Sequence, residues 1–312
     1  MDDLHPAIPA EVTTLEADTG SGSSQLIGRA IALLARAVRE SAERAAGAGG
    51  SEWLACRVRA VALAQPSMGA FWNAAALALA PPPRGGLAGL DRLALAVERA
   101  PRALSLAAVP ALRAGLPPGA PLRLVTCSFS GSVLACCAAL AEAGPLVVSC
   151  GEGRPVMEGR RLAEALAAAG VDVRLLTDGA LGLALEDAAA LLVGADAVMP
   201  SAWVNKAGTG PLAAAATARG IPVFVVASRD KFVPAMLDRL VRVPDRPPEE
   251  VWAGSPAGVT VVNRYFERVP LEWSTALITE AGVITPDAVP EVCRANGREV
   301  TDEIAARLAG GT

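Results

Sequence analysis

The two lysines of this chain are the residues whose type and spacing first suggest chemistry. Of its 28 basic residues only Lys206 and Lys231 are lysines, and the others are arginines. In a chain that uses arginine so consistently, a retained lysine indicates a place that needs a compact point charge rather than a wide planar guanidinium. Both lysines lie in a glycine-containing stretch that also holds Asp196 and Asp230. This combination predicts a site for an anionic small molecule.

The stretch around Lys206 offers several groups that bind anions. Asn205 and Lys206 supply an amide and an ammonium. Gly208 and Gly210 allow backbone N–H groups to converge where the next helix is expected to begin, which makes an anion cradle. The alternative is an ordinary lysine in an exposed loop, and Lys231 could likewise belong to a solvated cluster with its charged neighbours.

The histidine content excludes several classes of enzyme. His5 is the only histidine, and it lies in an expected floppy arm, so a Ser-His-Asp or Cys-His hydrolase and a His-ligated zinc enzyme are excluded. Acid–base chemistry must then come from Asp, Glu, Cys, Lys or the single tyrosine, Tyr265. We therefore expect a site without a metal ion and without a cofactor.

Charge and hydropathy set further limits. The net charge is −4 with both signs mixed and no basic stripe, which argues against a nucleic-acid partner. No apolar run approaches the roughly 18 residues of a membrane span, and the N-terminus lacks the apolar core of a signal peptide. The six cysteines have no CxxC spacing, which is typical of reduced thiols. These features predict a cytoplasmic protein.

The first third of the chain is expected to be helical. A length of 312 residues predicts about two domains. Residues 1–17 are interpreted as a flexible arm, and residues 18–118 as a helical domain because no strand periodicity occurs there. The expected helices of this domain cover 25–46, 51–64, 71–80 and 87–107.

Residues 119–312 have a different pattern, in which short apolar runs alternate with helical stretches. This alternation predicts an α/β fold, with a Rossmann-like parallel sheet and right-handed crossovers. Ligands of such sheets bind at the carboxyl ends of the strands, and the two lysines follow two expected strands. Strands are expected over 122–126, 146–149, 171–176, 197–199, 223–227 and 262–269, with helices over 133–143, 157–169, 181–192, 210–219 and 299–309 and a Pro-rich loop over 242–261.

Several short motifs occur together and in a characteristic order. They are Thr126–Ser130, Glu152–Pro155, Gly159–Arg160, Val193–Asp196, Asn205–Thr209, Lys231–Phe232 and Thr279–Val283. This set resembles the alpha, beta and delta regulatory subunits of translation initiation factor 2B and their enzyme relatives, ribose-1,5-bisphosphate isomerase and methylthioribose-1-phosphate isomerase. The resemblance covers roughly residues 15–290. It implies a helical domain on a Rossmann-like domain, a homodimer or larger homo-oligomer, and a sugar-phosphate pocket between the domains.

The resemblance also implies roles for individual residues. Asp196 matches the acid–base aspartate of the isomerases, a role that requires the carboxyl to lie within about 3 Å of the moving proton. Asn205, Lys206 and Lys231 are expected to hold phosphate or hydroxyl groups of the ligand. From spacing alone, an aspartate that caps a loop remains the alternative for Asp196.

Gly20, Ser21 and Gly22 resemble the glycine-rich turn that contacts phosphate in the isomerases, although a flexible linker would have the same composition. Two departures weaken the expected phosphate site. Ribose-1,5-bisphosphate isomerase has an arginine just before this turn where the chain has Thr19, and the isomerases have an arginine where it has Gln65. Both changes remove a positive charge.

Two further places suit an anion. Ser130, Gly131 and Ser132 begin an expected helix, whose N-terminal amides favour phosphate. Arg154 follows an expected strand, and either pairs with phosphate or holds the neighbouring loop.

The largest departure concerns the proton-handling thiol. The isomerases have Cys where this chain has Ser128, and His where it has Cys127. A serine hydroxyl does not titrate near neutral pH, whereas cysteine titrates near about 8.5, so Ser128 needs a base to move a proton. Adjacent side chains of a strand face opposite sides, so Cys127 should point away from the pocket unless a turn re-aims it.

Two functions remain open at this point. The first is an aldose–ketose isomerase for a phosphorylated sugar, of the ribose-1,5-bisphosphate isomerase type with an altered active site. The second is a non-catalytic regulatory protein that binds a sugar phosphate or nucleotide. Ser128 and the two missing arginines favour the second, whereas Asp196 and Lys206 favour a working pocket. We lean towards the enzyme.

Overall fold

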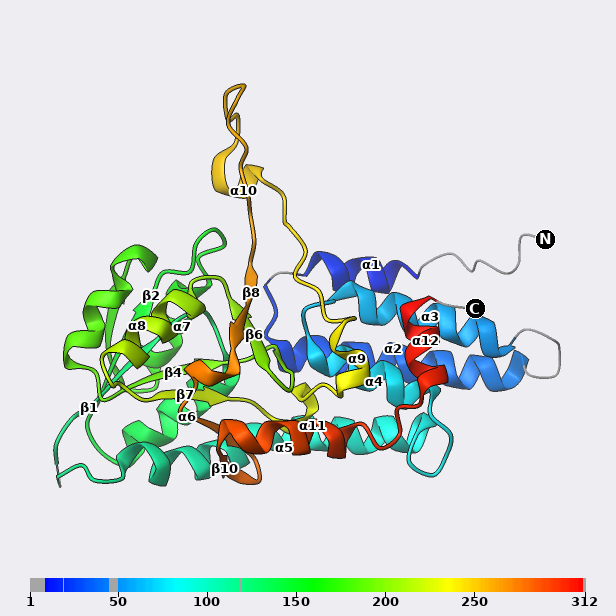
Figure 1. Cartoon of the computed structure of the whole chain (residues 1–312), viewed down its shortest axis with the longest axis horizontal. Coiled ribbons are helices and arrows are strands. Elements are labelled where there is room, and N and C mark those ends of the chain that lie inside the picture. Colours follow the sequence, from blue (N-terminus) through cyan, green and yellow to red (C-terminus); the bar gives the residue numbers. More distant parts are fainter. Residues whose placement is uncertain (1–8, 19, 45–49, 118, 311–312) are drawn as a thin grey trace.

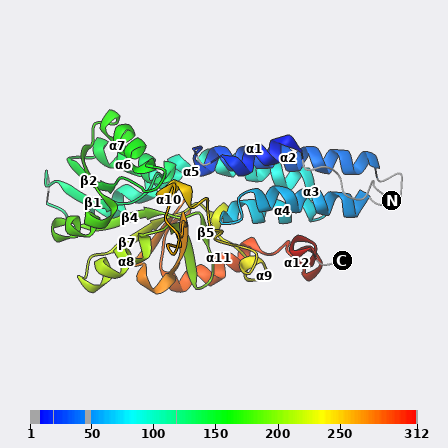
Figure 2. The same cartoon turned by 90° about the horizontal axis from the view of Figure 1, so that it is seen from above.

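The computed structural model describes residues 9–18, 20–44, 50–117 and 119–310, so His5 and Thr19 lie outside it. A helical part and a sheet part lie end to end, and a long α-helix, α5, runs from one to the other (Figure 1, Figure 2). This arrangement confirms the predicted fold class. Among the described residues, no helix is long and apolar enough to cross a membrane.

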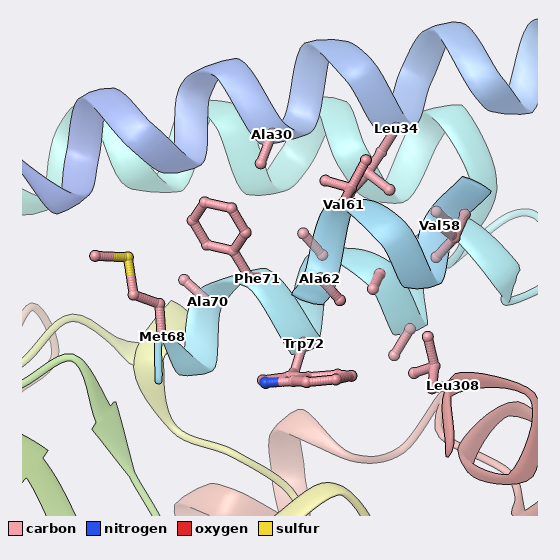
Figure 3. Close-up of a cluster of buried hydrophobic side chains, with 14 of the residues drawn as sticks. Ala30, Leu34, Val58, Val61, Ala62, Met68, Ala70, Phe71, Trp72 and Leu308 are labelled. Atoms are coloured by element: carbon pink, nitrogen blue, oxygen red, sulfur yellow. The ribbon is translucent and has the colours of Figure 1, made fainter. Parts of the chain in front are cut away.

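The helical part is built around an apolar core. Phe71 and Trp72 are almost completely buried and pack among Leu34, Val61 and small alanines, which let the helices approach closely (Figure 3). Helix α2 buries one apolar stripe, as its sequence spacing predicts, whereas α4 is buried on nearly all sides. The helices are α1 (Ala10–Ala17), α2 (Ser23–Arg44), α3 (Gly50–Ala64), α4 (Gly69–Leu79) and α5 (Gly86–Arg113).

The predicted flexible arm is wrong for its described residues. Residues 10–17 form α1, in which Val12 and Leu15 are buried against the helical core. A single pair of apolar residues is too short a pattern for the helical period to be recognised, and tertiary contacts stabilise the helix instead. The remainder of the arm, residues 1–8, lies outside the described residues.

The main sheet has seven strands in the order β10-β9-β7-β4-β1-β2-β3. All neighbouring pairs are parallel except β10 and β9, so the sheet is mostly parallel and doubly wound. The strand order reverses between β1 and β4, where such folds bind their ligands. The strands are β1 (Leu122–Thr126), β2 (Leu146–Gly151), β3 (Asp172–Leu176), β4 (Ala190–Gly194), β7 (Val223–Val226), β9 (Ala276–Thr279) and β10 (Gly282–Ile284).

Two predicted elements differ from the structure. The helix expected over 181–192 is a 3₁₀ stretch over Asp178–Asp187, followed by β4. A fully buried strand lacks alternation, so its apolar run cannot be distinguished from a helix by periodicity. The strand expected at 197–199 does form, as β5 (Ala197–Val198), but it belongs to a second, antiparallel sheet with β6 (Ala202–Lys206) and β8 (Phe266–Pro270).

Three of the remaining helices do not cover the sheet, and one of them, α9 (Ala235–Asp238), packs on the helical core through Leu237. The segment that carries α10, which lies between β7 and β8 along the chain, projects from the rest of the molecule (Figure 1). The C-terminal helix α12 returns to pack on α3 and α4, so it lies in the helical part rather than the sheet domain expected over 119–312. The remaining helices are α6 (Gly131–Glu142), α7 (Glu158–Ala168), α8 (Thr209–Ala218), α9 (Ala235–Asp238), α10 (Glu249–Trp252), α11 (Val289–Asn296) and α12 (Asp302–Ala309).

Candidate active site

A pocket lies at the carboxyl ends of β1 and β4, where the strand order of the sheet reverses. The helical part closes one side with the N-terminal turn of α2, and the segment before β8 closes another. The pocket therefore requires both parts of the chain. The predicted site residues that line it are Gly20, Ser21, Gly22, Ser128, Ser130, Asp196, Asn205, Lys206 and Lys231.

Asp196 follows β4 and is held rigidly between the two parts. Its backbone N–H donates to the carbonyl of Val204 at 2.8 Å, and its own carbonyl accepts from Gly69, also at 2.8 Å. The side chain is half-buried and faces the pocket. Burial raises the pKa of the carboxyl, and the positive charge of Lys231 offsets part of that rise. A carboxyl in a cleft whose pKa is raised by burial is a candidate acid–base group.

Lys231 brings a buried positive charge to the same place. The residue is 6% exposed, and its ammonium donates to the carbonyl oxygen of Ala195 at 2.7 Å and to Ser23 Oγ at 3.4 Å. Within the described part of the chain, no ion pair neutralises it. A buried ammonium without a direct ion pair favours an anionic ligand.

Lys206 is different, because its charge already has a partner. Its ammonium lies 2.7 Å from Glu158 Oε1, and both side chains are nearly inaccessible to solvent. The same Glu158 oxygen accepts a hydrogen bond of 3.1 Å from Ser128 Oγ. Ser128 follows β1 with a φ of 66°, a left-handed conformation that is costly for a residue with a side chain. Ser128, Glu158 and Lys206 therefore form one hydrogen-bonded chain in the pocket.

The predicted anion cradle after Lys206 is also filled from within the protein. The amides of Gly208 and Gly210 donate to Glu267 Oε1 at 2.6 and 2.9 Å, at the beginning of α8. The sequence predicts the anion cradle, but it does not indicate that the Glu267 carboxylate binds there, because Glu267 lies on another strand. The amides are therefore engaged with a carboxylate of the chain itself.

In the glycine-rich turn before α2, the backbone amides are likewise engaged by a carboxylate of the chain itself. Asp18 Oδ1 accepts from the amides of Gly20 and Ser21 at 3.0 and 2.8 Å, and Oδ2 accepts from Ser21 Oγ and from Arg29. Burial alone would raise the pKa of the Asp18 carboxyl, but the hydrogen bonds from Ser21, Arg29 and the turn amides hold it well below its usual range. The turn is therefore ordered by an internal carboxylate rather than left as a linker.

Cys127 faces away from the pocket, as the alternation of a strand predicts. Its sulfur lies 3.2 Å from Thr209 Oγ1, among the apolar side chains that pack on the other face of the sheet. Burial raises the pKa of the thiol to about 11, so it is protonated at neutral pH. Asn205 donates to the same Thr209 oxygen at 3.0 Å, which fixes its amide at the pocket wall.

The other predicted residues lie around the pocket. Ser130 caps α6 by accepting from Val133 at 3.3 Å, and Gly131 is the first residue of that helix. Ser132 lines a second, smaller cavity that Asp196 and Lys231 also border. Arg154 lies away from the pocket: its amide donates to Asp178 Oδ2 and its guanidinium donates to the carbonyl of Val251. This arrangement favours the structural role of Arg154.

Sequence reasoning missed two arginines that line the pocket. Arg161, on α7, stacks over the ring of Phe129 at 5.0 Å, and Arg246 stacks over Tyr265 at 5.3 Å. Arg246 comes from the Pro-rich stretch that the sequence assigned to a loop excursion. The spacing around it carries no local signal, because only the fold returns this stretch to the pocket. The two guanidiniums add positive charge to a pocket whose chain lacks the arginines that the resemblance leads us to expect at positions 19 and 65.

The comparison with known proteins identifies the class. A model of the Initiation factor 2 subunit family matches residues 121–286, more than half of the chain. The chain belongs to this family, which confirms the resemblance that its motifs indicate. It is similar to a solved structure of translation initiation factor eIF-2B from Pyrococcus horikoshii OT3, with a TM-score of 0.73 and 26% identity over 89% of this chain and 98% of that one.

Two curated relatives are named as sugar-phosphate isomerases. The ribose 1,5-bisphosphate isomerase of Methanocaldococcus jannaschii is 31% identical over 167 residues, 52% of this chain and 54% of that protein. A putative methylthioribose-1-phosphate isomerase of Archaeoglobus fulgidus is 37% identical over 148 residues, 45% of this chain and 43% of that protein. The chain thus matches about half the length of these relatives.

Proposed function

We propose that this protein is an aldose–ketose isomerase for a phosphorylated sugar, of the ribose-1,5-bisphosphate isomerase type with serine in place of the proton-handling thiol. The observation that carries the proposal is Asp196, a half-buried carboxyl with a raised pKa, lining one pocket with the buried ammonium of Lys231. The carboxyl supplies acid–base chemistry, and the ammonium attracts the phosphate.

The charges of the pocket support a phosphorylated ligand. Lys231, Arg161 and Arg246 all line it, and none of the ion pairs within the described residues involves them. The carboxylates of Asp18 and Glu158 are already held by hydrogen bonds within the protein. The charge that remains to be compensated by a ligand is therefore positive, as a sugar phosphate requires.

A second function is favoured by the missing thiol. Cys127 lies on the other face of the sheet. By the resemblance of the motifs, Ser128 matches the position at which the isomerases carry Cys. A pocket with the binding groups and no second proton-transfer group would serve a regulatory protein that binds a sugar phosphate or a nucleotide. Both functions require the protein to bind the phosphorylated ligand, but only the isomerase converts it into a product.

The test is turnover by the wild-type protein and by Asp196→Asn. Proton NMR would follow ribose 1,5-bisphosphate and methylthioribose 1-phosphate, and thermal shift would measure binding of the same compounds and of nucleoside monophosphates. We expect isomerisation by the wild type, loss of at least about 100-fold in Asp196→Asn, and retained binding. Unchanged turnover in the variant would exclude Asp196 as the acid–base group, and binding without wild-type turnover would establish the regulatory function.

We also propose that the protein is a cytoplasmic homo-oligomer. The support for an oligomer is that a protein of the same fold, from C. thermophilum, was solved in a tetrameric complex of two beta and two delta subunits. Light scattering after size exclusion would give the mass in solution. A monomer over the micromolar range would contradict this part of the proposal.

A further inference from the structure

The hydroxyl of Ser128 has a specific hydrogen-bond partner in the pocket. Ser128 Oγ lies 3.1 Å from Glu158 Oε1, and Glu158 is 9% exposed. The backbone fixes the position of this hydroxyl, because Ser128 has a φ of 66°, a conformation that persists only where the surroundings enforce it. A hydroxyl next to a buried carboxylate is the arrangement that allows a weak nucleophile or acid to exchange its proton.

The carboxylate of Glu158 is also compensated and positioned. Lys206 lies 2.7 Å from the oxygen that accepts from Ser128, which balances the buried negative charge. The other oxygen, Oε2, is buried without a hydrogen-bond partner among the described residues. Both donors of the carboxylate thus lie on Oε1, and Oε2 keeps its capacity to accept a hydrogen bond.

We infer that Glu158 is the proton acceptor that allows Ser128 to replace a thiol in this pocket. This inference rests on the proposed isomerase function. In interconversion of an aldose and a ketose, a proton must move between the oxygens of two neighbouring carbons while another moves between the carbons themselves. Asp196 serves the carbon-bound proton. Ser128 and Glu158 serve the oxygens.

The proton transfers between the two oxygens need no proton donor or acceptor other than the ligand, Ser128 and Glu158. Ser128 Oγ takes the proton of the ligand hydroxyl as its own proton passes to Glu158 Oε1. The proton then returns through Ser128 to the neighbouring oxygen, which was the carbonyl, and Glu158 is a carboxylate again. One carbon is oxidised as its neighbour is reduced, so no external oxidant or reductant takes part. Glu158 lines the pocket and acts on the ligand through Ser128, as a positioning and proton-accepting residue.

The test is a double-mutant comparison with a rescue. Glu158→Gln keeps the side-chain shape and an oxygen that can accept from Ser128, but it cannot take the proton and no longer neutralises Lys206. With ribose 1,5-bisphosphate or methylthioribose 1-phosphate, whichever the wild type isomerises, we expect kcat to fall by about 100-fold or more and KM to change by less than about threefold. Ser128→Cys supplies a group that titrates near about 8.5 and does not need the carboxylate. The double variant Glu158→Gln with Ser128→Cys should therefore recover at least about tenfold in kcat.

Glu152→Gln is the matched control. It removes a carboxylate that pairs with Arg160 at the same β2–α7 turn, so it should leave kcat unchanged. An unchanged kcat in Glu158→Gln would overturn the inference while leaving the isomerase function intact. A fall in kcat that Ser128→Cys fails to restore would assign Glu158 a merely structural role and would also overturn it. A wild-type protein that isomerises neither compound overturns both the inference and the function on which it rests.

Discussion

At the scale of single residues, the site depends on the environment of Asp196. Burial raises the pKa of this carboxyl above its ordinary value of 3.8, and Lys231 opposes the rise only in part. The folded protein therefore binds this proton more tightly than the unfolded chain does. The resulting stabilisation is present below the unfolded pKa and is lost as pH rises through the folded pKa. The ionised form of Asp196 thus costs stability relative to the protonated form.

The direction of this pKa shift gives a prediction for the stability of Asp196→Asn that does not depend on enzymatic activity. We expect the variant to be more stable than the wild type at neutral pH, on the order of 1 kcal/mol, because it removes a buried charge at a functional site. The difference should shrink as pH falls towards the ordinary pKa of the carboxyl. Urea unfolding over the acidic-to-neutral range would measure it. A variant less stable than the wild type throughout would show that Asp196 is held as a favourable ion.

At the scale of elements, the contact between α7 and β2 positions Glu158. Gly159 follows Glu158 and lies directly against the end of β2. A Cβ at this position would collide with the carbonyl oxygen of Gly151 and would lie 2.8 Å from the carbonyl carbon of Glu152. Both obstacles are backbone atoms, which cannot rotate away as a side chain does. The helix can therefore approach the strand only because this residue is glycine.

We accordingly expect Gly159→Ala to destabilise the protein by about 3 kcal/mol, as overpacking against a rigid neighbour does. Gly28→Ala is the contrasting control, because Gly28 lies exposed in α2 and a methyl group there would meet no heavy atom of another segment within 4 Å. Alanine favours the helix there, so a gain of about 0.5–1 kcal/mol is expected. Denaturant titration would measure the free energy of unfolding of both variants. Equal effects of the two substitutions would contradict the close approach of α7 and β2.

At the scale of the whole molecule, the helical part depends on the far end of the chain. Leu308 of α12 is 1% exposed and packs into the core of the helical part beside Val58 and Trp72 (Figure 3). Arg307 adds a hydrogen bond of 2.6 Å to the carbonyl of Ser51. Helix α12 thereby stabilises the helical part, which supplies one wall of the pocket.

Leu308→Ala should therefore destabilise the folded protein by about 2–5 kcal/mol, the usual range for removing a buried leucine. Leu106→Ala is the matched control, because that leucine is 70% exposed on α5 and its loss should change stability by less than about 0.5 kcal/mol. Thermal unfolding of both variants provides the measurement. If Leu308→Ala behaved like Leu106→Ala, α12 would not contribute to the helical core.

Much of the architecture could be predicted because its signals are local. The run Leu122–Thr126 gives β1 with the predicted bounds, and the amphipathic spacing of residues 25–46 gives α2 over its described part. The predictions failed where the local signal was ambiguous or too short. The buried run of β4 has the same apolar pattern as a buried helix, and α1 is stabilised by contacts with other helices rather than by its own sequence.

The amino-acid sequence alone establishes which groups are available: a retained Lys206 and Lys231, an aspartate after a strand at Asp196, and a hydroxyl at Ser128. Folding in three dimensions sets which of these groups are already paired. Glu158 lies 30 residues from Ser128 along the chain, and Glu267 lies 59 from Gly208, yet both make short hydrogen bonds. Hydrogen bonds and ion pairs depend on distances of a few ångströms in space, which local patterns do not encode. The fold therefore couples Lys206 to Glu158 and leaves Lys231 outside the ion pairs of the described residues.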